Sequence, residues 1–82
     1  MNPDEEGTVI RALEEWVFSH PHKDRPFLIF MGRSFTPVEY FHEVIDNPEF
    51  RSDLFRFLEE QAERSQERPV DMIRRAVEAN RL

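Results

Sequence analysis

Cysteine is absent from all 82 positions of this sequence. That absence excludes a disulfide framework, a thiolate zinc site and a cysteine nucleophile. Glycine is nearly absent as well, and the two that occur, Gly7 and Gly32, are too few for a loop that cradles phosphate groups. No serine has a histidine and an acid at a spacing that indicates nucleophilic catalysis. The sequence therefore supports neither a hydrolase nor a nucleotide-binding protein, and we expect no enzymatic activity and no cofactor.

Long apolar runs are also missing. The longest runs only from Phe27 to Met31, whereas a transmembrane helix needs about 20 consecutive apolar residues. The first residues are acidic and lack the basic region with which a secretory signal peptide begins. We therefore expect a cytoplasmic protein that does not contact a membrane.

The charge is predominantly negative, with 17 acidic against 11 basic residues and a net charge of −6. The acidic excess lies in residues 1–48, whereas residues 49–82 are nearly neutral. Non-specific affinity for nucleic acid comes from neutralising phosphates, so this charge disfavours nucleic-acid binding. An acidic surface instead favours solubility or a basic partner.

Four prolines mark the expected starts of four helices. Proline is tolerated in the first helical turn because its missing N–H would have no partner there. The clearest start is Thr36-Pro37-Val38-Glu39, where a threonine N-cap and a glutamate three residues later form a capping box. The predicted helices span residues 3–19, 37–46, 48–65 and 69–80.

Apolar residues recur at spacings of three and four in these ranges and give each helix one face to bury. The predicted buried residues are Val9, Ile10, Leu13, Trp16 and Val17; Val38, Phe41, Val44 and Ile45; Phe50, Leu54, Phe57, Leu58 and Ala62; and Val70, Ile73, Ala76 and Val77. The pattern predicts an all-α, four-helix bundle-like single domain over residues 1–82. A core of this size supplies only about 3–5 kcal/mol, so a partner subunit is the expected additional stabiliser.

The connector over residues 20–35 is ambiguous. The apolar run from Phe27 to Met31 is compatible with a buried strand, a short helix or an extended plug over the core, and periodicity does not separate these structures. The sequence indicates no second strand with which it could pair, and a solitary strand edge invites aggregation. The plug is therefore the favoured structure.

Large apolar residues outnumber those that four helix faces need. Three of them lie at or beyond the margins of the predicted faces: Phe18, Phe55 and Met72. Their positions are explained either by a wide apolar stripe that packs in the core or by a surface on which a partner docks. Seven of the eight phenylalanines fall between Phe27 and Phe57, so a docking face would centre on the plug and the next two helices. We predict a small acidic protein-interaction module, acting as an adaptor, a regulatory subunit or a self-associating scaffold, whose partner is another protein or a second copy. The predicted contact residues are Phe30, Phe35, Tyr40 and Phe55.

Two groups of residues contain potential metal ligands. Glu39 and His42 have the Glu-x-x-His spacing with which di-iron bundles place two ligands on one helix face, but one chain lacks the other ligands. His20, His22 and Asp24 carry zinc-ligand atoms, although a histidine at a helix C-terminus is equally explained as a favourable cation there. We therefore predict a solvated helix face and no metal.

The last third of the chain offers an alternative function. Residues 54–58, 62–65 and 70–76, which include Ile73-Arg74-Arg75-Ala76, resemble the two helices of ribbon-helix-helix repressors, whose second helix typically carries a similar Ile-Arg-x-Ala run. The resemblance implies a dimeric DNA-binding regulator or antitoxin. That family has a DNA-reading strand directly before its first helix, where this chain has the helix over 37–46 and Asn47-Pro48. Gln66 replaces the turn glycine of the family.

Overall fold

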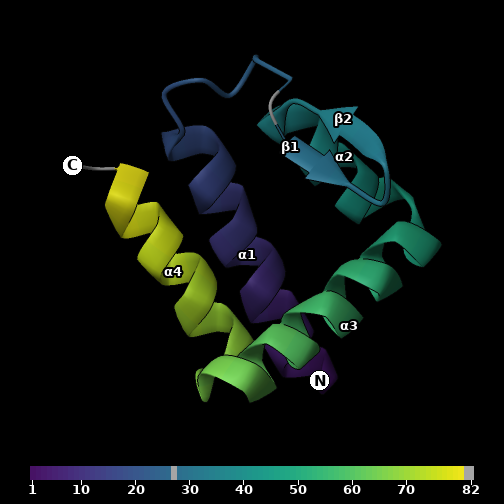
Figure 1. The fold of residues 1–82 in the computed structure, drawn as a ribbon, viewed down its shortest axis with the longest axis vertical. Coiled ribbons are helices and arrows are strands. Elements are labelled where there is room, and N and C mark those ends of the chain that lie inside the picture. The colour runs from purple at the N-terminus through teal and green to yellow at the C-terminus, as the bar shows by residue number, and fades with distance from the viewer. Residues whose placement is uncertain (27, 81–82) are drawn as a thin grey trace.

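Four helices and one β-hairpin make up the described part of the chain, residues 1–26 and 28–80 of a computed structural model (Figure 1). In chain order the elements are α1 (Pro3–Ser19), β1 (Leu28–Phe30), β2 (Arg33–Phe35), α2 (Pro37–Asp46), α3 (Pro48–Ser65) and α4 (Pro69–Asn80). The four helices have the predicted bounds. The prediction of a mostly helical fold with four helices is confirmed. The structure differs from an all-α fold in one respect, because residues 28–35 form a two-stranded hairpin.

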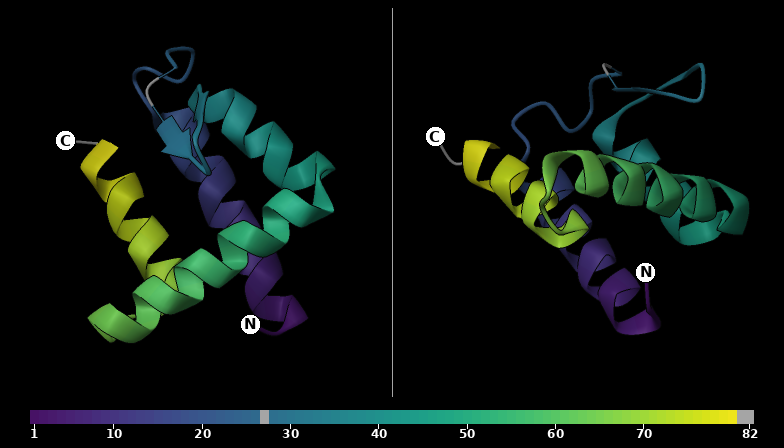
Figure 2. Two further views of the ribbon diagram at one scale, coloured as in Figure 1. Left: turned by 45° about the vertical axis from the view of Figure 1, so that its right-hand side comes forward. Right: turned by 60° about the horizontal axis from the view of Figure 1, so that its bottom comes forward.

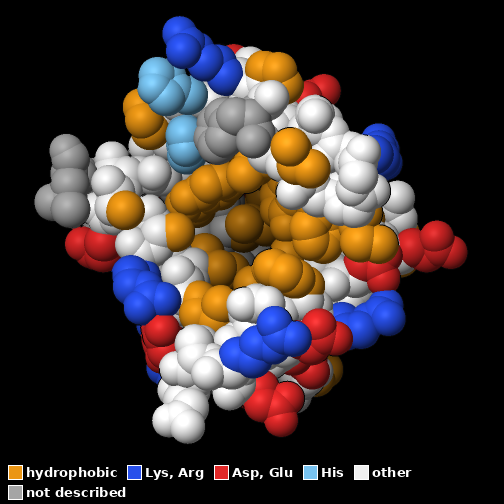
Figure 3. All heavy atoms as spheres, in the orientation of Figure 1, with side chains coloured by type: hydrophobic (Ala, Val, Ile, Leu, Met, Phe, Trp, Pro, Cys, Tyr) orange, Lys and Arg blue, Asp and Glu red, His pale blue; other side chains and the backbone are white. Residues whose placement is uncertain are grey.

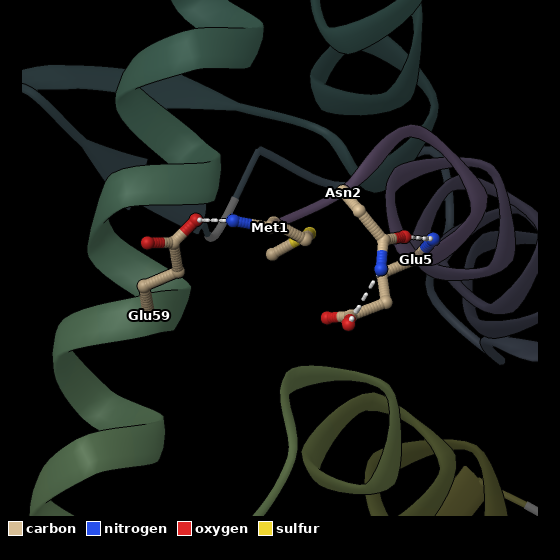
Figure 4. A network of polar contacts seen from close by, with 4 residues as sticks. All are labelled: Met1, Asn2, Glu5 and Glu59. Carbon is tan, nitrogen blue, oxygen red and sulfur yellow. Dashed lines mark hydrogen bonds and ion pairs between the residues drawn. The ribbon is translucent and has the colours of Figure 1, made fainter.

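Polar residues directly before the helix prolines explain these starts. Thr36 Oγ1 accepts a hydrogen bond from the Glu39 N–H at 3.0 Å, and Glu39 Oε1 accepts one from the Thr36 N–H at 2.9 Å, which completes the capping box. Asn2 Oδ1 accepts from the Glu5 N–H at 2.8 Å, and its Nδ2 donates to the Glu5 carboxylate at 3.2 Å (Figure 4). Asn47 caps α3 in the same manner. Each cap of this kind contributes about 1 kcal/mol.

A two-residue turn joins β1 and β2. Met31 and Gly32 both have positive φ, 54° and 76°. Positive φ at both central residues is the signature of a type I′ turn, whose twist matches that of the strands it joins. The strands are antiparallel, with Leu28 opposite Phe35, Ile29 opposite Ser34, and Phe30 opposite Arg33.

The predicted plug is therefore replaced by the hairpin, although Phe27 itself lies outside the described residues. The expectation that no second strand exists was wrong because Arg33-Ser34-Phe35 contains a single apolar residue. The turn also gives a weak signal, since methionine precedes its glycine where asparagine or aspartate is usual. Pairing between adjacent segments removes the need for a second molecule to complete β1.

The helices pack around one shared core. α1 and α4 lie side by side, and α3 runs from the corner it shares with α4 towards α2 (Figures 1 and 2). The Met1 amino group lies 2.8 Å from Glu59 Oε1 and links the start of α1 to α3 (Figure 4). The connected core residues are Val9, Ala12, Leu13, Phe35, Tyr40, Val44, Phe50, Leu54, Phe55, Leu58 and Ile73.

On α2 and α3 the edge of the buried face differs from the predicted one, whereas Val44, Phe50, Leu54 and Leu58 are buried as predicted. On α2, Tyr40 is buried and Ile45 is exposed, because β1 and β2 each bring a phenylalanine ring against the Tyr40 ring, with centroids 5.8 and 6.0 Å away. On α3, Phe55 is buried, whereas Phe57 is 44% exposed. The rings of the hairpin account for the burial of Tyr40. The spacing of apolar residues along a helix does not by itself decide which residue at the edge of the apolar face is covered.

Candidate functional site

An apolar groove opens at the centre of the face shown in Figure 3, where hydrophobic side chains line a hollow. Its volume is about 330 Å³, which lies at the lower end of the range for ligand pockets. Residues from α1, β1, α2, α3 and α4 form its walls. The lining residues are Leu13, Trp16, Leu28, Ile29, Phe30, Tyr40, Leu54, Phe57, Leu58, Met72, Ile73 and Ala76.

The arrangement of the helices leaves this space open. Gln66 adopts a left-handed conformation with φ 57° and ends α3, so the chain turns sharply and α4 leaves the shared corner in a new direction (Figure 1). Apolar residues three and four apart on α3 and α4 face the space between the diverging helices. α1 contributes Leu13 and Trp16 to the same space, and β1 borders it. The groove is thus made of apolar faces that residues 1–26 and 28–80 leave uncovered.

The chemistry of the lining is almost wholly apolar. None of the lining residues is charged, and only Trp16 and Tyr40 carry a side-chain N–H or O–H group. Ile29 is 77% exposed and Phe57 is 44% exposed, so the apolar surface continues out of the groove onto its rim. Large apolar residues that gather on a rim in this way mark an interaction surface more often than isolated ones do.

A smaller acidic depression, of about 220 Å³, adjoins the groove. Phe30 and Phe57 line both, and the depression adds Met31, Asp53, Arg56 and Glu60. Arg56 Nη2 lies 2.6 Å from Asp53 Oδ1, so these two charges compensate each other. Glu60 has no ion-pair partner among residues 1–26 and 28–80. With Asp53, Arg56 and Glu60 in its lining, the depression carries a net charge of −1.

The structure brings two of the four predicted contact residues to the groove. Phe30 is half-buried and Tyr40 is 9% exposed, and both line it. Phe35 and Phe55 are instead core residues, because the Phe35 ring packs on Tyr40 and Phe50 and α3 directs Phe55 inward. A partner on the surface would not reach these two side chains.

Several groove residues were missed by the sequence analysis. Ile29 and Leu28 were counted only as part of a plug, and Phe57 was predicted to be buried. Trp16 was placed on the core side of α1, although it is half-buried at the groove. Successive residues of a strand face opposite sides. Knowledge of the hairpin would therefore have placed Ile29 on the opposite face of β1 from Leu28 and Phe30.

Two of the potential metal ligands, Glu39 and His20, form hydrogen bonds within the chain. The Glu39 carboxylate accepts the Thr36 N–H in the capping box. His20 Nδ1 accepts the His22 N–H at 3.0 Å, and burial lowers the pKa of His20, with a smaller contribution from the nearby His22. Within the described ranges, no group of three or more histidine, aspartate or glutamate residues is placed to hold a metal ion.

The region that resembles ribbon-helix-helix repressors has a helix, α2, where that family has its DNA-reading strand. Three arginines between residues 54 and 76 are paired with acids of the same chain. One is Arg56, whose partner is Asp53. Arg68 Nε lies 3.1 Å from Asp71 Oδ2, and Arg75 Nη2 lies 2.8 Å from Glu67 Oε1. These acids reduce the positive potential that phosphate binding requires.

Tyr40 allows a direct test of burial at the groove, because it is the only tyrosine. Burial raises the pKa of its phenol well above the ordinary value of about 10. A raised phenol pKa means that the folded state favours the neutral form. This contribution to stability is complete below about pH 10 and is lost as the pH rises above that value. We expect phenolate absorbance to appear only at distinctly higher pH, together with loss of helical circular dichroism. Ionisation near pH 10 with the helices intact would contradict the burial.

Comparison with protein-family models, curated proteins and solved structures finds no match to this chain. In the part of the chain that the structure describes, none of the helices combines the length and apolar character needed to cross a bilayer.

Proposed function

We propose that this protein is a small interaction module, an adaptor, regulatory subunit or self-associating scaffold, that binds an apolar segment of a protein chain in the apolar groove. The observation that carries this proposal is the continuity of an uncharged groove with the exposed side chains of Ile29 and Phe57. Covering such a surface is favourable by about 25 cal/mol for each Å² of apolar area removed from water.

The chemistry of the groove favours a protein segment over a small metabolite. Small-molecule sites combine apolar walls with several convergent polar groups that fix the ligand's orientation. Here Trp16 and Tyr40 alone among the lining residues could supply such groups. Much of the available apolar surface also lies on the rim, at Ile29 and Phe57, where a small molecule inside the groove would not cover it.

Aromatic residues are the expected anchors of the interface. Trp16, Phe30, Tyr40 and Phe57 all line the groove, and tryptophan and tyrosine are enriched among the residues that dominate binding energy. The acidic depression beside the hairpin turn favours a partner with a positive charge next to its apolar segment. The net charge of −6 also favours a positively charged partner.

A comparison of two charge substitutions tests this function. Phe57→Lys introduces a charge into the groove at a site already 44% exposed, whereas the control Phe18→Lys changes a residue that is 62% exposed and does not line the groove. We expect affinity capture from cells that produce the protein to recover the same binding proteins with the wild type and Phe18→Lys, and to lose them with Phe57→Lys. Circular dichroism should show equal helix content in all three.

Retention of every captured protein by folded Phe57→Lys would contradict the proposal. Loss of capture with Phe18→Lys alone would place the binding surface on α1 outside the groove.

A further inference from the structure

We infer that the segment bound at the β1 side of the groove is β1 of a second copy of this chain, paired antiparallel with Ile29 opposite Ile29. The inference rests on the proposed function and names its partner. It would make the protein a two-fold symmetric dimer in which each copy presents the same surface to the other.

The first argument concerns the backbone edge of β1 that faces away from β2. On that edge, the Ile29 N–H and C=O form no hydrogen bond with residues 1–26 or 28–80. In an antiparallel hairpin, opposed residues alternate between pairs that exchange hydrogen bonds and pairs that do not. The pair that closes a two-residue turn, here Phe30 and Arg33, exchanges them. The next pair, Ile29 and Ser34, therefore directs its N–H and C=O groups outward, away from the partner strand. Ile29 offers one donor and one acceptor on the outer edge of β1, and Ser34 offers the same on the outer edge of β2.

The second argument is the position of that edge. All three residues of β1 line the apolar groove, whereas none from β2 does. β2 instead packs on α2 and buries Phe35. A strand added to β1 thus extends the sheet over the groove, where backbone hydrogen bonds and apolar side-chain burial act together. This combination is the basis of peptide recognition by strand addition.

The third argument is charge complementarity between two copies. In the antiparallel register centred on Ile29, the Leu28 end of β1 in one copy lies beside the Met31 end of β1 in the other. Arg25, three residues before Leu28 in the sequence, is exposed. The Met31 end carries the acidic depression, to which Glu60 contributes its carboxylate. Symmetry brings Arg25 towards Glu60 twice, and such complementary charges fix the register of an interface.

Proline substitutions separate the two hairpin edges. Ile29→Pro removes the outward N–H on the groove side, and Ser34→Pro removes the equivalent N–H on the opposite edge. Neither substitution removes a donor that the hairpin uses internally, and proline is tolerated on edge strands. We expect light scattering after size-exclusion chromatography, over a wide range of concentration, to show a dimer for the wild type and for Ser34→Pro. Ile29→Pro should be monomeric, with unchanged helix content.

A charge exchange gives a second test that does not depend on the hairpin backbone. Arg25→Glu and Glu60→Arg should each weaken the homodimer about tenfold, because like charges then meet at both symmetric positions. An equal mixture of the two variants should form a heterodimer. At one symmetric position the two substituted side chains, which have opposite charges, face each other. At the other position the natural pair of Arg25 and Glu60 is present. This test decides the inference if Ile29→Pro fails to fold.

A wild-type protein that stays monomeric at every concentration would overturn the inference. A dimer that survives Ile29→Pro, or that Ser34→Pro dissociates, would overturn it too. In each of these cases, Phe57-dependent capture of a different protein would leave the proposed function standing. If capture does not depend on Phe57 either, the proposed function fails as well.

Discussion

Phe50→Ala is expected to leave the domain largely unfolded at room temperature. The Phe50 ring is 7% exposed and packs edge-to-face on Phe30, Phe35 and Tyr40, with centroids 5.3, 5.4 and 5.4 Å away. Truncating a buried phenylalanine to alanine costs about 3–5 kcal/mol. The whole core of a domain this small supplies only about 3–5 kcal/mol of net stability. The loss therefore approaches the total free energy of unfolding.

Circular dichroism during urea unfolding measures this effect. Phe50→Leu retains part of the side-chain volume and should reduce the free energy of unfolding by less than Phe50→Ala does. Phe18 is 62% exposed. Phe18→Ala should therefore change the free energy of unfolding by less than about 0.5 kcal/mol. If Phe50→Ala unfolds cooperatively and its free energy of unfolding is lower than that of the wild type by less than about 1 kcal/mol, the aromatic cluster that joins the hairpin to α2 and α3 is not the centre of the core.

Phe55→Ala and Phe57→Ala are expected to have opposite consequences, although the residues lie two positions apart on α3. Phe55 is 7% exposed and belongs to the core, so its truncation should cost about 3–5 kcal/mol of stability. Phe57 is 44% exposed on the rim of the groove, and its truncation should cost less than about 1 kcal/mol. Partner binding should instead weaken with Phe57→Ala, because an aromatic anchor of the groove is lost.

Urea unfolding of the two variants decides between two orientations of α3. The observed orientation predicts a much lower midpoint for Phe55→Ala than for Phe57→Ala. The reverse order would support the face expected from spacing alone, in which Phe57 is buried and Phe55 is free for a partner.

The helices could be predicted because their starts are determined locally. Thr36, Pro37 and Glu39 complete a capping box within one turn, and Asn2 and Asn47 cap with their own side chains. The hairpin could not be predicted in the same way. Its second strand is mostly polar, and its turn depends on Met31 adopting a left-handed conformation with φ 54°, which few non-glycine residues do.

The groove was only partly predictable for a related reason. An excess of aromatic residues near the hairpin was evident, and Phe30 and Tyr40 do line the groove. The side that each remaining aromatic faces depends on tertiary packing. Phe35 packs on Tyr40 and Phe50. Phe55 belongs to the core, whereas Phe57 is 44% exposed. Spacing along a helix defines a stripe, but neighbouring elements decide how much of its edge is covered.

Methionine methyl groups provide the most direct test that the groove is the binding surface. Met72 lines the groove, Met31 lies at the adjoining depression, and Met1 packs elsewhere against the core. We expect the methyl resonances of Met72 and Met31 to shift when a captured partner is added, or with rising concentration if the chain pairs with itself. The methyl resonance of Met1 should stay in place. Binding that leaves Met72 and Met31 unshifted would contradict this role of the groove.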